Sequence, residues 1–471
     1  MTIESLPKLT KAPIPLQTHT LKIEERLAKG KALREVAARK AQREWKPPAN
    51  RLDPVDLLIE SSKGRMEELL PIRYGRMMVS PFTFYRGAAA IMAYDLSNTP
   101  STGLTLVADG DCHLLNFGGF ATAERKLVFD INDFDEVSFA PWEWDLKRLV
   151  ASFVIAAQSN GFDPIDSQEA GWLAAQSYRL QMAEYTRMPT LEVWSEAFDL
   201  DTVINNIKDK DTRRFYAKKL SKATEQSAHE KEFAKLTFKA GDRPRIVDQP
   251  PLIFHYSDER DEELMRIATS TIKEYKRSLN LGVSLLLERF QTVDVAFKVV
   301  GVGSVGTMCG IMLLMSGLGD PLFLQFKQAR QSVLEPYCGA NPYSHAGQRV
   351  VVGQRVMQTA GDMFLGWTTG TGEGKRQFYI RQLSDAKVKP VIEIMKPENL
   401  KDYAGLCGRT LARAHARSGD PAVLTGYMGK STAFEDALAE FGRTYAEQNE
   451  RDHACLMEAI RSGRLEATQV E

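Results

Sequence analysis

Between residues 104 and 145, acidic and amide side chains directly follow short apolar strands, and no other feature constrains the fold as strongly. An apolar strand over residues 104–107 leads into the polar turn DGDCHLLN, residues 109–116. A hairpin with its turn at residues 122–126 returns as strand 127–131, which runs into the acidic sequence NDFDE. Burying a carboxylate without a partner is costly, and oxygen ligands suit divalent cations. The pattern therefore predicts that these strand ends hold a cation.

The spacing of the polar residues adds a second indication. Asp111 and Asn116 are five residues apart. In the kinase catalytic loop this spacing separates the Asp that accepts the substrate hydroxyl proton from an Asn that binds Mg²⁺. Asp133-Phe134-Asp135 then follows, where a kinase carries the Asp-Phe-Gly whose Asp holds the metal. Carboxylates that only cap turns and helices would explain any one residue, but the whole set favours a functional site.

Composition limits the class of protein. A chain of 471 residues predicts two or three lobes with their own cores. The 61 basic and 61 acidic residues cancel, which argues against a nucleic-acid or acidic-membrane partner. Five cysteines without a CxxC pair predict a reducing compartment and no zinc site. No signal peptide and no membrane span are predicted, so we expect a cytoplasmic protein.

A second informative region is the glycine-rich stretch of residues 293–328. It predicts three strands, over residues 295–302, 306–315 and 322–326, with Lys327 ending the third. Further strands at residues 362–367 and 377–383 complete a five-stranded lobe, with a helix predicted over residues 346–360 between them and the first three.

The first turn of this region has the pattern Gly301-x-Gly303-x-x-Gly306, with Ser304 inside it. Such glycines let backbone amides approach a phosphate closely. As a dinucleotide fingerprint the turn would lead into a helix, with Asp320 roughly placed for the ribose. As a kinase glycine-rich loop it would return as a strand, and Lys327 would pair the phosphates. A hairpin without a ligand is the third possibility, and the strand-turn-strand pattern with its lysine favours the kinase interpretation.

At this point the motifs resemble a known superfamily. GDxHxxN from Gly110, DFD from Asp133 and PxxxDL from Pro141 are similar to the aminoglycoside phosphotransferase and choline kinase branch of the protein-kinase-like superfamily. Most of residues 45–465 also resembles domain-of-unknown-function family 2252, which consists of uncharacterised bacterial proteins. The sequence motifs that carry this resemblance are SPF, GDxHxxNFG, NDFDE, PWEWDLKR, VVGVGSVGT and LARAHARSGD.

The resemblance implies an α+β, protein-kinase-like fold with two lobes, a small antiparallel sheet and a large helical lobe. We expect an N-terminal arm (residues 1–50), a helical catalytic lobe (51–290), a β-rich nucleotide-binding lobe (291–395) and C-terminal helices on the catalytic lobe (396–471).

The order of the motifs along the chain is the reverse of that in kinases, because the catalytic loop precedes the glycine loop. A circular permutation would explain this order. Residues 403–415 resemble the helix that leads into the catalytic loop, so a permuted fold must place them beside residues 104–116. It must also bring Lys327 close to Asp133.

The resemblance also implies roles for individual residues. Asp111 would be the catalytic base, with Asn116 and Asp133 as metal ligands, and Asp145 would brace the catalytic loop. Asp130 or Asp135 could replace Asp133 as the main metal ligand.

Further residues complete the expected site. His113 adjoins the base and is better suited to fixing the loop through backbone hydrogen bonds than to acid–base chemistry. Gly301, Gly303, Ser304, Gly306 and Lys327 would bind ATP phosphates.

Some positions remain open. The glutamate that should pair with the lysine has no clear candidate: Glu335 is near in sequence and Gln348 is uncharged. Arg73, Arg76 and Arg86 could face phosphate, although such residues more often are solvated or pair with acids.

The expected function is therefore an ATP- and Mg²⁺-dependent phosphotransferase acting on a hydroxyl of a small molecule or protein. The alternatives are a catalytically weak or inactive ATP-binding regulatory module, a nucleotidyl transferase and, more distantly, a dinucleotide-dependent oxidoreductase.

Overall fold

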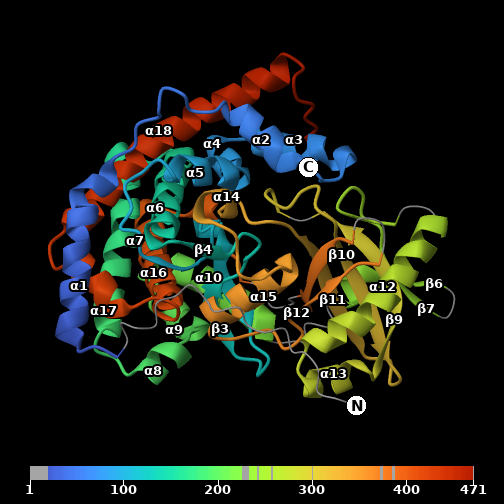
Figure 1. Cartoon of the computed structure of the whole chain (residues 1–471). Helices are drawn as coiled ribbons and strands as arrows, with labels where there is room; N and C mark the ends of the chain where they lie inside the picture. Colours follow the sequence, from blue (N-terminus) through green and yellow to red (C-terminus); the bar gives the residue numbers. More distant parts are fainter. Residues whose placement is uncertain are drawn as a thin grey trace.

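A six-stranded antiparallel sheet and a larger body of helices form the two parts of the chain (Figure 1). The computed structural model describes residues 20–224, 233–240, 243–255, 258–299, 301–371, 375–383 and 388–469. The strands of the sheet are, in spatial order, β12 (Gly366–Thr369), β13 (Gln377–Gln382), β11 (Pro321–Ala329), β10 (Cys309–Ser316), β9 (Phe290–Lys298) and β8 (Ile253–Phe254). Every neighbouring pair is antiparallel. The α+β class with a small antiparallel sheet is thus confirmed.

The sheet is covered on both faces, as its continuous apolar strands require. Successive side chains of a strand point to opposite faces, so Met312 and Leu314 of β10 pack on one side and Ile311 and Leu313 on the other. Helices α12 (Asp258–Ser278) and α13 (Leu281–Leu287) supply the first cover. The hairpin β6 (Thr237–Ala240) and β7 (Arg243–Ile246) lies towards the second. The sequence analysis placed these elements in the helical lobe 51–290, but in the structure they pack on the sheet.

The helical body is built around α6 (Trp142–Ser159), which is buried along almost its whole length. The helices that make up the rest of this body are α2 (Pro54–Ser62), α3 (Leu70–Met77), α4 (Pro81–Gly87), α5 (Ala89–Leu96), α7 (Pro164–Tyr185), α8 (Thr190–Ser195), α9 (Leu200–Asn205), α10 (Lys210–Thr224), α16 (Pro397–Ala416), α17 (Pro421–Met428) and α18 (Ala433–Arg461). Several start at an Asp cap followed by Pro, as at Asp53, Asp163 and Asp420. Within the described residues, no helix combines the length and apolar character needed to cross a bilayer.

Two small strand groups position the polar loops on this body. Strand β1 (Thr105–Ala108) pairs with β4 (Ser138–Pro141), and β2 (Phe117–Ala121) pairs with β3 (Leu127–Ile131), which also meets β5 (Phe198–Asp199). The predicted strand at residues 104–107 and the hairpin turn at 122–126 are therefore confirmed.

Helix α16 lies against these loops although it is almost 300 residues away in sequence. The Tyr403 hydroxyl donates to the Leu114 carbonyl oxygen over 2.7 Å. Just beyond the helix, the Ser418 hydroxyl accepts from the Val107 amide at 3.2 Å. The predicted proximity of residues 403–415 to residues 104–116 is thus present.

The N-terminal segment packs on the C-terminal helices over its described part. Helix α1 (Ile23–Val36) lies against α17, where Arg26 forms an ion pair with Asp420 at 2.5 Å. Gly30 lets the two backbones approach closely, because a methyl group there would lie 1.9 Å from the Val423 carbonyl oxygen. Residues 23–36 are therefore part of the helical body, although the sequence predicted an arm.

Two further helices connect the parts. The short α14 (Glu335–Cys338) follows β11, and α15 (Ala346–Met357) packs against β11, β12 and β13.

Candidate functional site

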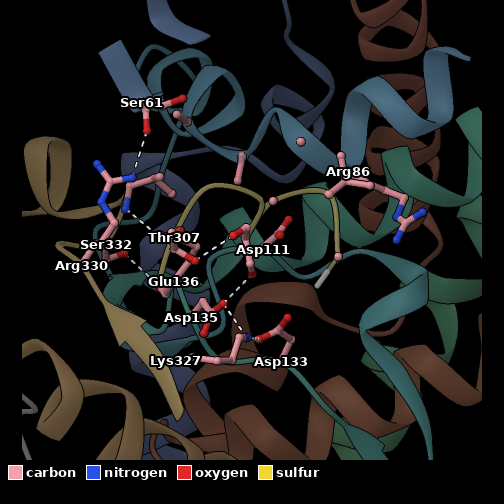
Figure 2. Close-up of a pocket in the computed structure, with 18 of the residues that line it drawn as sticks. Ser61, Arg86, Asp111, Asp133, Asp135, Glu136, Thr307, Lys327, Arg330 and Ser332 are labelled. Carbon is pink, nitrogen blue, oxygen red and sulfur yellow. Dashed lines mark hydrogen bonds and ion pairs between the residues drawn. The ribbon is translucent and has the colours of Figure 1, made fainter. Parts of the chain in front are cut away.

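A cavity of about 750 Å³ lies where the sheet meets the helical body (Figure 2). This volume is in the range of small-molecule sites. The predicted site residues that line the cavity are Asp111, His113, Asn116, Asp133, Asp135, Gly301, Gly303, Ser304 and Lys327. They come from the loop after β1, the loop after β3, the β9–β10 turn and strand β11. The tertiary structure thus brings together two regions that are almost 200 residues apart.

Lys327 links the sheet to the loop after β3. Its Nζ lies 3.2 Å from Asp133 Oδ1 and 2.7 Å from Asp135 Oδ2, and the lysine is only 3% exposed. Burial alone would lower the pKa of Lys327, but the two carboxylates raise it well above its usual value, so the ammonium group stays charged.

Asp135 is the most extensively bonded carboxylate of the site. Besides Lys327, it accepts hydrogen bonds from the Ser304 hydroxyl at 2.9 Å and the Tyr379 hydroxyl at 2.5 Å. Burial opposes ionisation, yet the charge of Lys327 and these hydrogen bonds lower the pKa of Asp135 to about 2. One carboxylate therefore joins the acidic loop, the glycine-rich turn and strands β11 and β13.

Asp111 faces the cavity from the opposite side and is one-fifth exposed. Its Oδ1 accepts from Arg148 Nε at 2.8 Å, and its Oδ2 lies 4.0 Å from His113 Nε2. Burial raises the pKa of Asp111 to about 7, against the opposing charge of Arg148. A carboxylate with such a pKa can accept a proton near neutral pH.

Asn116 and His113 hold the shape of the Asp111 loop. Asn116 Nδ2 donates to the Asp111 carbonyl oxygen over 2.7 Å, and His113 Nδ1 accepts from the Leu115 amide at 3.2 Å. Burial, with repulsion from Arg86 and Arg148, lowers the pKa of His113 well below its usual value. The neutral imidazole and its backbone bond match the structural role that the sequence favoured.

Asp145 lies beneath the loop in the first turn of α6, outside the lining of the cavity. Its carboxylate accepts from the backbone amides of Asp109 at 2.6 Å and Gly110 at 2.9 Å. His415 Nε2 lies 3.1 Å from the same carboxylate, and the Tyr178 hydroxyl lies 2.9 Å from His415 Nδ1. The arrangement anchors the Asp111 loop to α6, α7 and α16.

The structure places Asp130 apart from the other proposed metal ligands. It does not line the cavity; it is buried and forms an ion pair with Arg413. Because strand side chains alternate, Asp130 on β3 faces α16, while the carboxylates beyond the strand end reach the cavity. The geometry leaves Asp133 and Asp135 as the aspartates of this region at the site.

The glycine-rich turn closes the cavity from the sheet. Gly301, Gly303 and Ser304 line it, whereas Gly306 turns away and its carbonyl oxygen accepts from the Met66 amide at 2.7 Å. Gly301 and Gly306 have φ values of +61° and +85°, which favour glycine. The chain then enters strand β10 at Cys309, later than the predicted position 306. Since no helix follows the turn, the dinucleotide fingerprint lacks its required context.

Several functional residues were not anticipated from the sequence. Arg148 follows Asp145 by one helical turn, so the DLKR sequence carried a signal for it. No sequence signal indicated Tyr379, because only the pairing of β13 with β11 brings it close to Asp135. Glu335, considered as the partner of Lys327, instead lies 3.7 Å from Arg349, and α15 contains no acidic residue.

The described residues contain no group of three His, Cys, Asp or Glu side chains that could hold a metal ion by themselves. Mg²⁺, however, commonly binds one or two carboxylates and completes its shell with water and substrate phosphates. Asp133 and Asn116 both line the cavity, and no hydrogen bond to Asp133 Oδ2 is found among the described residues. These donors fit a cation that arrives with a phosphate ligand.

Comparison with known proteins places the chain in one family. No curated protein and no solved structure matches it. The model of the family described as "Uncharacterized protein conserved in bacteria (DUF2252)" matches residues 65–459, which include every site residue that the sequence predicted. The chain belongs to this bacterial family.

Proposed function

We propose that the protein is an ATP- and Mg²⁺-dependent phosphotransferase of kinase-like fold that acts on a hydroxyl group. The observation that carries the proposal is the meeting of Lys327 with Asp133 at 3.2 Å beneath a glycine-rich turn. In kinases a lysine of the third strand pairs the phosphates, an aspartate holds the metal and a glycine loop covers the nucleotide. Lys327 lies on the third of the strands β9, β10 and β11.

Each residue of the site would have its own role in the reaction. The acceptor hydroxyl oxygen forms a bond to the γ-phosphorus, the bond from that phosphorus to the oxygen of ADP breaks, and Asp111 takes the hydroxyl proton. Asp133 and Asn116 would hold Mg²⁺, which neutralises charge on the phosphates. Lys327 and the backbone of the glycine turn would position the nucleotide. Phosphoryl transfer needs little else from a protein than such positioning and charge stabilisation.

A circular permutation accounts for the order of the motifs. The contacts of Tyr403 with the Asp111 loop and of Ser418 with strand β1 support it, since α16 follows the glycine turn and the sheet in sequence yet lies where a kinase has the helix preceding its catalytic loop. The strands and the glycine turn then occupy the middle of the chain.

One observation favours the alternative of a weak or regulatory nucleotide-binding module. Lys327 pairs with the carboxylates of the acidic loop, and α15 offers no glutamate for the lysine–glutamate pair of active kinases. Binding of ATP without turnover would identify this alternative.

Thermal unfolding of the purified protein with ATP, ADP and NAD, each with and without Mg²⁺, tests the proposal. A ligand that binds only the folded chain raises the midpoint by mass action. We expect a Mg²⁺-dependent rise with ATP that is lost in the double variant Lys327→Ala, Asp133→Ala.

Lys401→Ala is the matched control, because Lys401 also lies between two acids, 2.7 Å from Asp166, but outside the cavity. It should retain the full rise. Absence of a shift with any nucleotide, or a response to NAD alone, would contradict the proposal.

A further inference from the structure

The charge of the cavity differs from that of the chain as a whole. Among the described residues, nine basic and five acidic side chains line the cavity, so its lining carries an excess of four positive charges, whereas the whole chain has a formal charge of zero. ATP bound with Mg²⁺ would neutralise only about half of this excess. The remainder indicates a second anion.

Three arginines account for much of the excess, and we call Arg65, Arg73 and Arg330 the arginine cluster. All three converge on Ser61. Arg65 Nε and Arg330 Nη1 donate to its carbonyl oxygen at 3.2 and 3.1 Å, and Arg73 Nη2 donates to its hydroxyl at 3.3 Å. Figure 2 shows Arg330 beside Ser61, across the pocket from Arg86, with Asp111 and Asp135 between the two arginines.

Arg73 of the arginine cluster is buried and Arg65 and Arg330 are partly exposed, and within the described residues none of the three is neutralised by an ion pair. Arg73 is 2% exposed, and no carboxylate of the described residues lies within 4.0 Å of any of the three guanidinium groups. Glu136 acts on Arg65 and Arg330 from beyond ion-pair distance, as Asp135 does on Arg65, and Glu136 Oε2 accepts from the Val333 amide at 2.8 Å. Their other hydrogen bonds go to neutral carbonyl and hydroxyl oxygens. Buried charges held only by neutral groups are costly, so a bound anion would stabilise them.

Each member also keeps a donor for which no protein partner is found in the described part of the chain. Arg73 Nε is buried without a hydrogen bond, and none is found for Arg65 Nη2 or Arg330 Nε. Arg65 has a second use, because its Nη1 donates to the carbonyl oxygens of Gly303 and Val305 and fixes the glycine turn.

We propose that the arginine cluster binds a phosphate group carried by the acceptor, so that the substrate is a phosphorylated hydroxyl compound. The inference rests on the proposed function, because the same cavity must hold the nucleotide and the acceptor together. Three guanidinium groups around one point suit a tetrahedral dianion better than a carboxylate, which offers two oxygens in one plane.

Calorimetric titration of inorganic phosphate into the protein saturated with Mg²⁺ and a non-hydrolysable ATP analogue tests this inference. We expect binding that weakens about tenfold or more in Arg330→Gln and is partly restored in Arg330→Lys, because a charged hydrogen bond contributes about 1.5–3 kcal/mol. Acetate at the same ionic strength should bind more weakly than phosphate.

Arg417→Gln is the matched control. Among the described residues Arg417 also donates only to carbonyl oxygens, those of Val356, Trp194 and Arg355, but it lies outside the cavity. This variant should bind phosphate like the wild type.

The outcomes separate this inference from the proposed function. Binding of the analogue without any binding of phosphate, or competition between phosphate and the analogue, would overturn the inference and leave the phosphotransferase proposal standing. If phosphate binding depends on Arg330 but the protein does not bind the analogue, the phosphotransferase proposal would be wrong and the anion site would stand. Equal loss in Arg330→Gln and Arg417→Gln would also overturn the inference.

Discussion

Two aspartates two residues apart have different surroundings, which fixes what each can do. Asp111 reaches the cavity and is held by Arg148, whereas Asp109 is fully buried and neither of its carboxylate oxygens has a hydrogen-bond partner among the described residues. Under the proposed function, the first would exchange a proton with the substrate. For the second, burial without a hydrogen-bond partner favours the neutral acid.

Asp111→Asn should lower turnover by about 10²–10⁴-fold and change nucleotide affinity little, because general-base catalysis acts in the transition state. The wild-type kcat/KM should rise with pH through an inflection near 7, since the base must be ionised and burial raises the pKa of Asp111 to about 7. Steady-state kinetics with parallel nucleotide titration would measure both. Equal loss of binding and turnover would contradict the assigned role.

Asp109→Asn should be tolerated and should stabilise the protein increasingly as pH rises. Burial, with the nearby Asp145 charge, raises the pKa of Asp109 well above its usual value. Above about pH 4 the unfolded chain releases this proton and the folded chain keeps it, which lowers the wild-type free energy of unfolding by up to about 1.4 kcal/mol per pH unit.

Urea unfolding of both proteins between about pH 5 and pH 8 would measure this difference. The exposed Asp201→Asn serves as control and should show no such trend. A stability difference for Asp109→Asn that is independent of pH would show that Asp109 is ionised.

At the scale of elements, helix α1 depends on close contact with α17. A methyl group at Gly30 would lie 1.9 Å from a carbonyl oxygen of α17, and one at Gly426 would lie 2.2 Å from the Leu27 carbonyl oxygen. Backbone oxygens cannot move aside as a flexible side chain can. The two glycines thus decide whether the N-terminal helix packs.

Gly30→Ala should therefore lower the free energy of unfolding by about 1–3 kcal/mol, as overpacking does, although alanine favours helix formation by about 1 kcal/mol. Gly282→Ala in α13 is the control, because its nearest neighbour atom lies 3.6 Å from the added methyl group. Denaturant unfolding should give opposite signs for the two variants. A stabilised Gly30→Ala would show that α1 does not pack on α17 as described.

The elements themselves were largely predictable. The hairpin β2–β3, strands β9, β10 and β11, and helices α15 and α16 all overlap the ranges that the sequence indicates for them. The predicted ends of the elements were less accurate, as at the start of β10. The glycines of the preceding turn do not show in the local sequence where the strand begins.

For the whole molecule, the site depends on the meeting of the helical body with the sheet. The large core surrounds α6, while the sheet has cores on each of its faces, and the cavity lies at their junction. Lys327 and Ser304 from the sheet, with Asp133 and Asp135 from the helical body, join them.

Hydrogen exchange with and without Mg²⁺ and ATP should consequently show protection in both parts at once, over residues 109–116 and 301–307. Helices α1 and α17 lie on the side of the helical body away from the sheet (Figure 1) and contribute no residue to the cavity lining, so they should exchange at unchanged rates. Protection confined to one of the two loops would contradict a site shared between the sheet and the helical body.

The sequence alone determined which candidate groups are available to the site, because residue types and short spacings indicate Asp111, Asn116, Asp133 and the glycine turn. Local patterns also determined most helices and strands. The tertiary structure decided which of these groups meet.

It paired Lys327 with Asp133 and Asp135, directed Asp130 towards Arg413 and gathered three arginines around Ser61. The physical reason is that a spacing along the chain fixes only which side of its own element a residue faces. Partners from distant segments are selected by burial of apolar faces and pairing of buried charges, which depend on the whole fold.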